Sequence, residues 1–289
     1  MTEHTIPQGV PAMPLERYLR RAWPLLPGRV LRDALKKRDV RVNGVKCGAD
    51  AAVRGGDALS IYLDDRWLSP EPDILFTDDR LIVAVKPQGL PVDVDRDGVG
   101  ADTLLARLRR RWPDAGLCHR LDAATGGIVL AAADEAVHAQ ALDAFRDHSG
   151  VRKLYRALAV GRFPQREGTL DAFLVKDARR GEVRVLHRDA PGARPIRTRY
   201  RVIGQRENGL AEVALEPVTG RTHQLRAHMA DFGHPLLGDD RYGDRAANRR
   251  HQCAKLCLWH ERLTVSNASP LVDYRGMTFE AQAPDWNKF

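Results

Sequence analysis

The fold is decided by the stretch Cys118-His-Arg-Leu-Asp-Ala-Ala-Thr-Gly-Gly-Ile-Val-Leu-Ala-Ala132, where a charged cluster leads through a Gly-Gly turn into an apolar run. The run 128–132 predicts a short buried strand, because it is apolar throughout and follows turn residues. Small residues after Asp122 leave room for a bulky group beside its carboxylate. An aspartate in such a place usually caps a turn, so a chemical role for Asp122 needs support from elsewhere in the chain.

The rest of the chain predicts a mixture of strands and helices. Strands are predicted from apolar runs and alternation, at 40–45 (entering an Asn-Gly turn), 55–63, 81–86, 155–160, 198–203 and 211–216. Helices are predicted where apolar residues recur at helical spacing, at 15–23, 29–38, 102–112, 134–148 and 222–232. Asp102 is expected to cap the third of these, with Arg107 on its solvent side, and Leu142 is expected to face inward on the fourth. Gly233 is expected to end the last. Because these elements follow no steady strand–helix–strand rhythm, we expect an α+β fold rather than a doubly wound sheet.

Composition shifts divide the chain into four predicted parts. Residues 1–13 hold prolines without apolar periodicity and are expected to be a flexible arm. Residues 14–64 form a small unit with two helices and two strands. The polar, proline-containing segment 65–73 is expected to be a linker. Residues 74–289 are expected to form the larger domain.

The positive charge is concentrated in the small unit. The whole chain has a net charge of +8. Between Leu15 and Leu63, eleven Lys and Arg residues face five acids, so this piece alone contributes +6. Arg29, Arg32 and Lys36 share one side of a predicted helix. This side is either an ordinary solvated surface or a contact surface for a phosphate backbone.

Composition also excludes several classes of protein. The 289 residues hold only four cysteines, too few for a disulfide scaffold, and this favours a reducing cytoplasm. No apolar run approaches the ~18 residues of a membrane span, so we expect no membrane association.

A second informative segment is 219–239, which contains a predicted helix. Leu225, Met229 and Phe232 face one way on that helix, while His223 and Arg226 face another. An arginine held by a packed helix is suited to pair with a carboxylate or a phosphate. The alternative is a surface salt bridge of little energetic value.

Several ordered motifs resemble those of the RluA family of RNA pseudouridine synthases. They are His119-Arg-Leu-Asp122 with Thr125–Leu130, Lys153–Leu158, Gly220–His228 and Gly233–Asp239. Lys86-Pro-Gln-Gly-Leu90 is similar to that family's first motif. The resemblance extends from about residue 74 to residue 265, and ordered motifs over this length are far more specific than one short pattern.

The resemblance implies both a fold and a reaction. The fold would be a mixed, mainly antiparallel sheet with flanking helices and a central cleft. The reaction would be the isomerisation of uridine to pseudouridine in RNA, without metal or cofactor. Asp122 would be the catalytic aspartate, Arg226 its ion-pair partner, and Tyr155 would lie against the target base. Arg120 would fill the place of the flipped nucleotide. Further RNA contacts are expected at His119, Arg221 and His223.

The small unit resembles the RNA-binding domain, of the alpha-L type, that is found in a small-subunit ribosomal protein. This resemblance favours phosphate contacts at Arg29, Arg32 and Lys36, and ribosomal RNA of the large subunit as substrate. Transfer RNA is the alternative substrate, and a catalytically silent RNA-binding or ribosome-assembly protein is the alternative function. We expect a monomer.

Two departures from the family pattern surround Asp122. The family usually has Ser at the position of Gly126, and Ala123-Ala124 replaces a larger polar pair. Adjacent glycines would loosen the turn behind Asp122 and alter the choice of substrate.

A zinc site and a hydrolase site are the two alternatives to this assignment. The residues His251, Cys253, Cys257 and His260 offer zinc ligands, but at no common spacing, and the cysteines are more simply small core residues. A hydrolase using Asp122 with His119 would lack both a nucleophile elbow and a metal-binding histidine pair.

Overall fold

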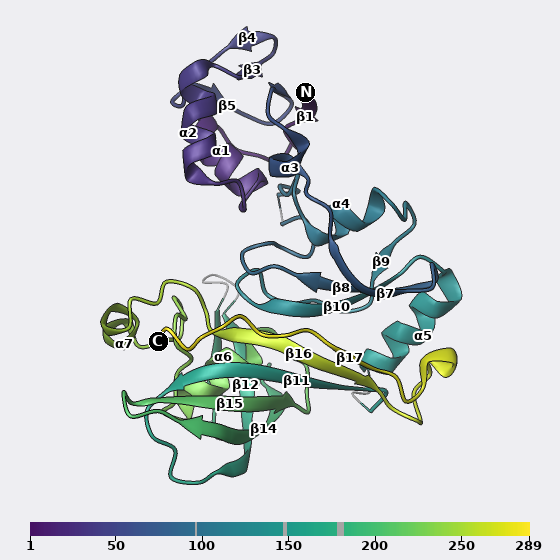
Figure 1. The fold of residues 1–289 in the computed structure, drawn as a ribbon, viewed down its shortest axis with the longest axis vertical. Helices are drawn as coiled ribbons and strands as arrows, with labels where there is room; N and C mark the ends of the chain where they lie inside the picture. The colour runs from purple at the N-terminus through teal and green to yellow at the C-terminus, as the bar shows by residue number, and fades with distance from the viewer. Residues whose placement is uncertain (96, 147–148, 178–181) are drawn as a thin grey trace. The chain divides into compact units, whose positions relative to one another are not determined.

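The computed structural model describes residues 1–95, 97–146, 149–177 and 182–289 (Figure 1). These residues form two compact units. Unit 1 consists of Met1–Asp73 and Gly89–Gly116, and unit 2 of Ile74–Gln88 and Leu117–Phe289. No helix in these described ranges is both long and apolar enough to cross a membrane.

Unit 1 is built on a small antiparallel sheet with the strand order β1-β6-β3-β4. Its strands are β1 (Thr2–Thr5), β3 (Val40–Val42), β4 (Val45–Lys46) and β6 (Ala58–Ile61), and a separate pair joins β2 (Met13–Pro14) to β5 (Ala52–Val53). Asn43 and Gly44 connect β3 to β4 with φ of 51° and 79°, as the predicted Asn-Gly turn requires.

The helices of unit 1 are α1 (Leu15–Ala22), α2 (Gly28–Lys37), α3 (Asp65–Leu68) and α4 (Leu104–Arg109). On α1, Leu15, Tyr18 and Leu19 are buried, which confirms the predicted apolar face. On α2 the buried residues are Leu31, Ala34 and Leu35, so its basic residues lie on the opposite side.

The division into units differs from the predicted boundaries at three places. Residues 1–13 are not a loose arm: β1 pairs with β6 along its whole length, and Ile6 is fully buried in the core of unit 1. The expected linker 65–73 differs as well, since it forms α3 in unit 1 and buries Leu68 in the same core. Residues 89–116, expected in the larger domain, group with unit 1. There the backbone N–H of Asp102 bonds to the carbonyl of Ala22, which ties this segment to α1.

The α4 segment differs from its prediction in detail. The side chain of Thr103, not that of Asp102, caps the helix. Asp102 instead accepts two hydrogen bonds from Arg107, at 2.6 and 2.8 Å. Arg107 was predicted to face solvent but is buried, because this bidentate pair satisfies its charge inside the unit.

Unit 2 is built on a large sheet with the strand order β13-β12-β14-β15-β11-β16-β10-β8-β7, in which β17 pairs with β16 and β9 with β10. The strands are β7 (Asp73–Thr77), β8 (Leu81–Lys86), β9 (Gly116–Leu117), β10 (Gly126–Ala132), β11 (Val151–Val160), β12 (Glu167–Asp177), β13 (Glu182–Leu186), β14 (Arg194–Gln205), β15 (Leu210–Pro217), β16 (Leu258–Val265) and β17 (Thr278–Glu280). The mixed, mainly antiparallel sheet and the α+β class are as predicted.

Helices α5 (Glu135–Arg146), α6 (Gln224–Asp231) and α7 (Arg245–Arg250) and the 3-10 helix η1 (Val272–Tyr274) complete unit 2. On α5, Val137, Ala141 and Ala144 are buried, whereas Leu142, predicted to face inward, is 40% exposed. The predicted end of this helix at residue 148 lies outside the described residues. Gly233, with φ of 87°, follows α6 as predicted.

One strand pair positions the candidate site. β10 runs parallel to β16, with Gly126 opposite Trp259 and Gly127 opposite His260, and antiparallel to β8. The loop carrying Asp122 enters β10 at this end. The strand β11 lies on the other side of β16 and brings Tyr155 opposite His260. Residues from four distant parts of the chain therefore meet at one end of β10.

Candidate active site

The loop that carries Asp122 is held by side chains from the end of β8. The N–H of Thr125 donates to the carbonyl of Asp122 at 3.0 Å, which closes a turn. Nζ of Lys86 donates to the carbonyl of Ala123, and Nε2 of Gln88 donates to that of Ala124, both at 3.1 Å. These bonds fix the loop backbone while the Asp122 side chain stays 25% exposed.

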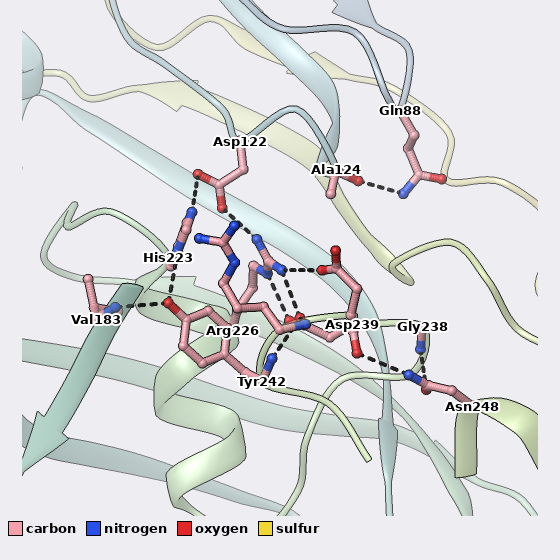
Figure 2. A network of polar contacts seen from close by, with 12 residues as sticks. Gln88, Asp122, Ala124, Val183, His223, Arg226, Gly238, Asp239, Tyr242 and Asn248 are labelled. Atoms are coloured by element: carbon pink, nitrogen blue, oxygen red, sulfur yellow. Dashed lines mark hydrogen bonds and ion pairs between the residues drawn. The ribbon is translucent and has the colours of Figure 1, made fainter. Parts of the chain in front are cut away.

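Helix α6 presents two nitrogen donors to the Asp122 carboxylate (Figure 2). Nε2 of His223 lies 3.7 Å from Oδ1, and Nη1 of Arg226 lies 3.6 Å from Oδ2. His223 precedes the helix with φ of 53°, and Arg226 follows one turn later. The structure therefore brings together Asp122, His223 and Arg226, which were predicted as site residues from two separate motifs.

The main partner of Arg226 is Asp239 rather than Asp122. Nε and Nη2 of Arg226 donate to the two oxygens of Asp239 at 2.8 and 2.7 Å, and both residues are buried. Nη2 also lies 3.2 Å from Asp240, and the guanidinium lies over the Tyr242 ring at 5.4 Å. Of the Arg226 nitrogens, only Nη1 is left to face Asp122, since the other two are occupied by Asp239.

Asp239 is itself fixed by the surrounding loop. Its Oδ1 accepts hydrogen bonds from the N–H groups of Arg241 and Tyr242, at 2.9 and 3.0 Å. The amide of Asn248 accepts from the N–H of Gly238 at 2.7 Å and donates to the Asp239 carbonyl at 3.0 Å (Figure 2). Burial raises the pKa of Asp239, but the hydrogen bonds and charge of Arg226 lower it more, so the pKa lies below its usual value.

Tyr155 lies behind the carboxylate as a buried aromatic surface. Its ring stacks on His260 at 4.5 Å with an interplanar angle of 15°. Nδ1 of His260 donates to the carbonyl of Ile128 at 2.7 Å, which fixes the stack to β10. Burial and then the charge of Asp122 raise the pKa of Tyr155, while burial lowers the pKa of His260 to about 3. Both rings are therefore neutral near pH 7.

The remaining predicted RNA contacts in unit 2 fall into two groups. Arg120 and Arg221 are exposed, and within the described ranges neither forms an ion pair. His119 differs: its Nε2 accepts the N–H of Leu130 at 3.1 Å and its ring stacks on Phe145 at 4.5 Å. These contacts make His119 a structural residue, because its side chain is already used within the fold. They also leave the hydrolase hypothesis, which paired His119 with Asp122, without support.

In unit 1, the predicted phosphate contacts lie on the exposed side of α2. Arg29, Arg32 and Lys36 lie on the side of the helix opposite its buried residues. The side chain of Arg29 is 89% exposed and forms only a long 4.0 Å pair with Asp33. Such cations remain available to a polyanion, since weak exposed pairs cost little to break.

Three residues of the site were present in the quoted motifs but received no predicted role: Lys86, Gln88 and Asp239. A fourth, Tyr242, lies beyond the last motif. Lys86 is fully buried, and its Nζ also donates to the carbonyl of Pro87 at 3.1 Å. Burial lowers the pKa of Lys86 to about 7, although the charge of Asp122 opposes this shift. A buried lysine beside a strand end is not distinguishable in sequence from an exposed one, so only its motif position singled it out.

The glycine pair was expected to loosen the turn behind Asp122. Instead, both glycines are closely packed against β16. A Cβ on Gly126 would lie 2.2 Å from Cζ3 of Trp259, and a Cβ on Gly127 would lie 2.2 Å from the carbonyl oxygen of His260. Gly127 also has φ of 110°. The glycines are required here because β16 approaches β10 too closely for a side chain.

The residues considered as zinc ligands do not converge. Sγ of Cys253 and Sγ of Cys257 lie 3.6 Å apart in an apolar cluster with Leu158 and Trp286, whereas His260 packs on Tyr155. Over the described part of the chain, no three His, Cys, Asp or Glu side chains are arranged to hold a metal ion. The cysteines therefore act as small core residues.

Comparison with known proteins identifies a family. A family model described as RNA pseudouridylate synthase matches residues 80–231. The chain is 35% identical over 212 residues to the dual-specificity RNA pseudouridine synthase RluA of Escherichia coli (strain K12), covering 73% of this chain and 92% of that protein. It is 30% identical over 253 residues to the ribosomal large subunit pseudouridine synthase C of Rickettsia conorii, covering 80% and 82%.

A solved structure shows the same similarity. The human protein named RNA pseudouridylate synthase domain containing 1 aligns with a TM-score of 0.59 and 26% identity, over 74% of this chain and 84% of its own.

Proposed function

The chain belongs to the RluA family of RNA pseudouridine synthases, and on that premise we propose that it isomerises specific uridines of large-subunit ribosomal RNA, with Asp122 as the essential catalytic residue. The observation that carries the proposal is the Asp122 carboxylate itself. It is one-quarter exposed, on a fixed loop, and its two oxygens face nitrogens of His223, just before α6, and of Arg226 in α6.

The reaction requires bonds to be exchanged at one sugar carbon. The bond from N1 of uracil to C1′ breaks, the base rotates, and a bond from C5 to C1′ forms. The proton lost from C5 is balanced by the proton that N1 gains. Asp122 either attacks as a nucleophile or removes a proton from the sugar, and both routes need its ionised form. Arg226, a permanently charged group, favours that form.

The other site residues take roles that follow from their positions. A target uridine in folded RNA must first leave its stack, at a cost of a few kcal/mol. We assign Arg120, exposed two residues before Asp122, to fill the vacated position. Tyr155, neutral and stacked on His260, offers an aromatic surface for the extruded base. We assign further RNA contacts to Arg221 and His223, which precede α6.

Ribosomal RNA is favoured as the substrate by the N-terminal part of the chain. The basic side of α2 in unit 1 suits a phosphate backbone. The Rickettsia conorii relative is named for the ribosomal large subunit, and its match covers more of this chain than the match to RluA of Escherichia coli. Transfer RNA is the second candidate, since that RluA is named dual-specificity. We further propose that the enzyme acts as a monomer in the cytoplasm.

The test is carbodiimide mapping of pseudouridine in unmodified transcripts of large-subunit ribosomal RNA and of transfer RNAs. We expect new stops at one or a few uridines of the ribosomal RNA. Asp122→Asn should abolish them, at least a thousandfold in kcat, while RNA affinity is retained. Asp273→Asn is the matched control, because it also removes a carboxylate paired with an arginine, Arg80, but at η1.

The outcomes separate the alternatives. Stops in transfer RNA alone would replace the substrate proposal but keep the reaction. Binding without stops in either RNA would favour a silent RNA-binding protein. Full turnover by Asp122→Asn would overturn the role of the carboxylate.

A further inference from the structure

A chain of polar contacts runs from Asp122 to the backbone of β13 (Figure 2). The N–H of Val183 donates to Oη of Tyr242 at 3.0 Å. Oη of Tyr242 lies 2.9 Å from Nδ1 of His223, and Nε2 of that ring faces Oδ1 of Asp122 at 3.7 Å. Asp122 is thus connected through two side chains to a strand that carries no predicted site residue.

The proton positions along this chain follow from donor and acceptor counting. A tyrosine hydroxyl has one proton, and Oη of Tyr242 already accepts the N–H of Val183. Donating its own proton to Nδ1 of His223 lets the hydroxyl use both its donor and its acceptor capacity, and this arrangement places the ring proton on Nε2. The opposite arrangement would leave a lone pair of Nε2 facing a carboxylate oxygen, and two acceptors repel each other. The contacts of His223 with Tyr242 and with Asp122 therefore both select the Nε2–H tautomer.

Burial keeps the His223 ring neutral near pH 7, so that its tautomer matters. Burial lowers the pKa of His223. Among the charged neighbours, Arg226 and Arg241 also lower it, whereas Asp122 and Asp239 raise it, and the net shift is downward. At pH 7 a neutral imidazole has only one N–H, and the hydroxyl of Tyr242 decides which nitrogen carries it.

We propose that Tyr242 is a positioning residue, which fixes His223 in the Nε2–H tautomer so that His223 donates to Oδ1 of Asp122 during the reaction. This inference rests on the proposed role of Asp122. Catalytic hydrogen bonds are often long before substrate binds and shorten in the complex, so the 3.7 Å separation is of the expected kind. With Arg226 facing Oδ2, two donors three residues apart then orient both carboxylate oxygens.

The first test measures the tautomer directly in the unaltered enzyme. In protein labelled with ¹⁵N at histidine, the ring nitrogens of His223 should show a protonated Nε2 and an unprotonated Nδ1 at pH 7. His223→Asn assigns the signals by removing them. A protonated Nδ1 in the wild-type protein would overturn the proposal without any reference to activity.

The second test is Tyr242→Phe. This change removes only the hydroxyl, because a phenyl ring keeps the place beneath Arg226 (5.4 Å) and beside His223 (5.7 Å). We expect kcat to fall about tenfold, the KM for RNA to stay within twofold, and the His223 signals to become those of mixed tautomers. Tyr274→Phe is the matched control, since it deletes a hydroxyl that donates to Asp78 at 2.7 Å far along the chain from the site.

A double variant separates positioning from a general loss of packing. His223→Asn removes the tautomer choice, and Asn tolerates the left-handed backbone at this position (φ of 53°). In that background Tyr242→Phe should cost no further activity, whereas two independent packing defects would add. Additive losses would overturn the proposal.

These measurements also distinguish a failure of this inference from a failure of the proposed function. If no RNA is modified by the wild-type enzyme, the proposed function fails, while the tautomer measurement still decides the state of His223. If the wild-type enzyme is active and Tyr242→Phe leaves both kcat and tautomer unchanged, the inference alone fails.

Discussion

At the scale of single residues, Arg226 has to serve two carboxylates with different tasks. Asp239 takes Nε and Nη2 in a buried bidentate pair, and this fixes the plane of the guanidinium. Nη1 is left to face Asp122 at 3.6 Å, outside hydrogen-bond distance. Asp122 therefore gains a nearby positive charge without being tied into a tight pair, and its carboxylate remains available to a substrate.

Asp239→Asn should weaken both the fold and the reaction. Removing one partner of a buried ion pair leaves the other charge uncompensated, so we expect a loss of about 3 kcal/mol in the free energy of unfolding. The freed guanidinium can then pair closely with Asp122, and kcat should fall about tenfold or more. Urea unfolding and turnover of the mapped RNA measure the two effects.

The stability loss should depend on pH in a defined direction. The pKa of Asp239 in the folded protein lies below its usual value of 3.8, so its stabilising contribution is complete above that value and is lost as the pH falls through the folded-state pKa. The gap between wild type and Asp239→Asn should be constant from pH 7 to pH 5 and narrow below about pH 4.

Asp102→Asn is the control, because it breaks the other buried bidentate pair, with Arg107 in unit 1. It should cost similar stability and leave kcat unchanged. Equal losses of kcat in both variants would contradict the role given to Asp239.

At the scale of elements, the site depends on how closely β16 approaches β10. The indole of Trp259 lies where a side chain at residue 126 would lie, and its Nε1 donates to the carbonyl of Ala281 at 3.0 Å, which holds the ring in place. The ring thus occupies the space that a serine side chain at residue 126 would need.

Gly126→Ser should therefore destabilise this protein by about 2 kcal/mol through overpacking against Trp259. The cost should largely disappear in a Trp259→Leu background, and thermal unfolding of the four proteins of this cycle measures it. Gly204→Ser, in β14 of the same sheet, is the control, because a Cβ there has no atom within 4 Å. An equal cost in both backgrounds would show that Trp259 is not the cause.

At the scale of the whole molecule, the two units divide the properties that an RNA enzyme needs. Unit 2 holds the carboxylate and the aromatic stack, and unit 1 holds the basic segment between Leu15 and Leu63, whose net charge is +6. Contacts to phosphates release counterions and so make binding dependent on salt, whereas contacts to the reacting base do not. Binding and turnover should therefore be separable by substitution.

Arg29→Ala with Arg32→Ala should weaken RNA binding and leave kcat at saturating RNA unchanged. Each lost phosphate contact should reduce the slope of log K against log salt by ~0.7 to 0.9. Filter binding at several salt concentrations gives this slope. Arg166→Ala with Arg194→Ala removes the same charge from exposed positions of unit 2. If this control reduced the slope equally, net charge rather than α2 would explain the effect.

The sequence alone determined the local features of this protein, which depend on short-range patterns of residues. The run 128–132, the helix after His223 and the Asn-Gly turn at residue 43 were all predicted correctly, because periodicity and turn chemistry act within a few residues. The motif around Asp122 likewise indicated the family.

Only the tertiary structure decided the partners. Arg226 pairs with Asp239, and Tyr242 contacts His223. The space beside Gly126 is filled by Trp259, which lies 133 positions further along the chain in a parallel neighbouring strand. Arg107 was predicted to be exposed for the same reason, since a charge looks solvated until its buried partner is known. Contacts of this kind depend on which strands pair and how closely they approach, and no local pattern encodes that distance.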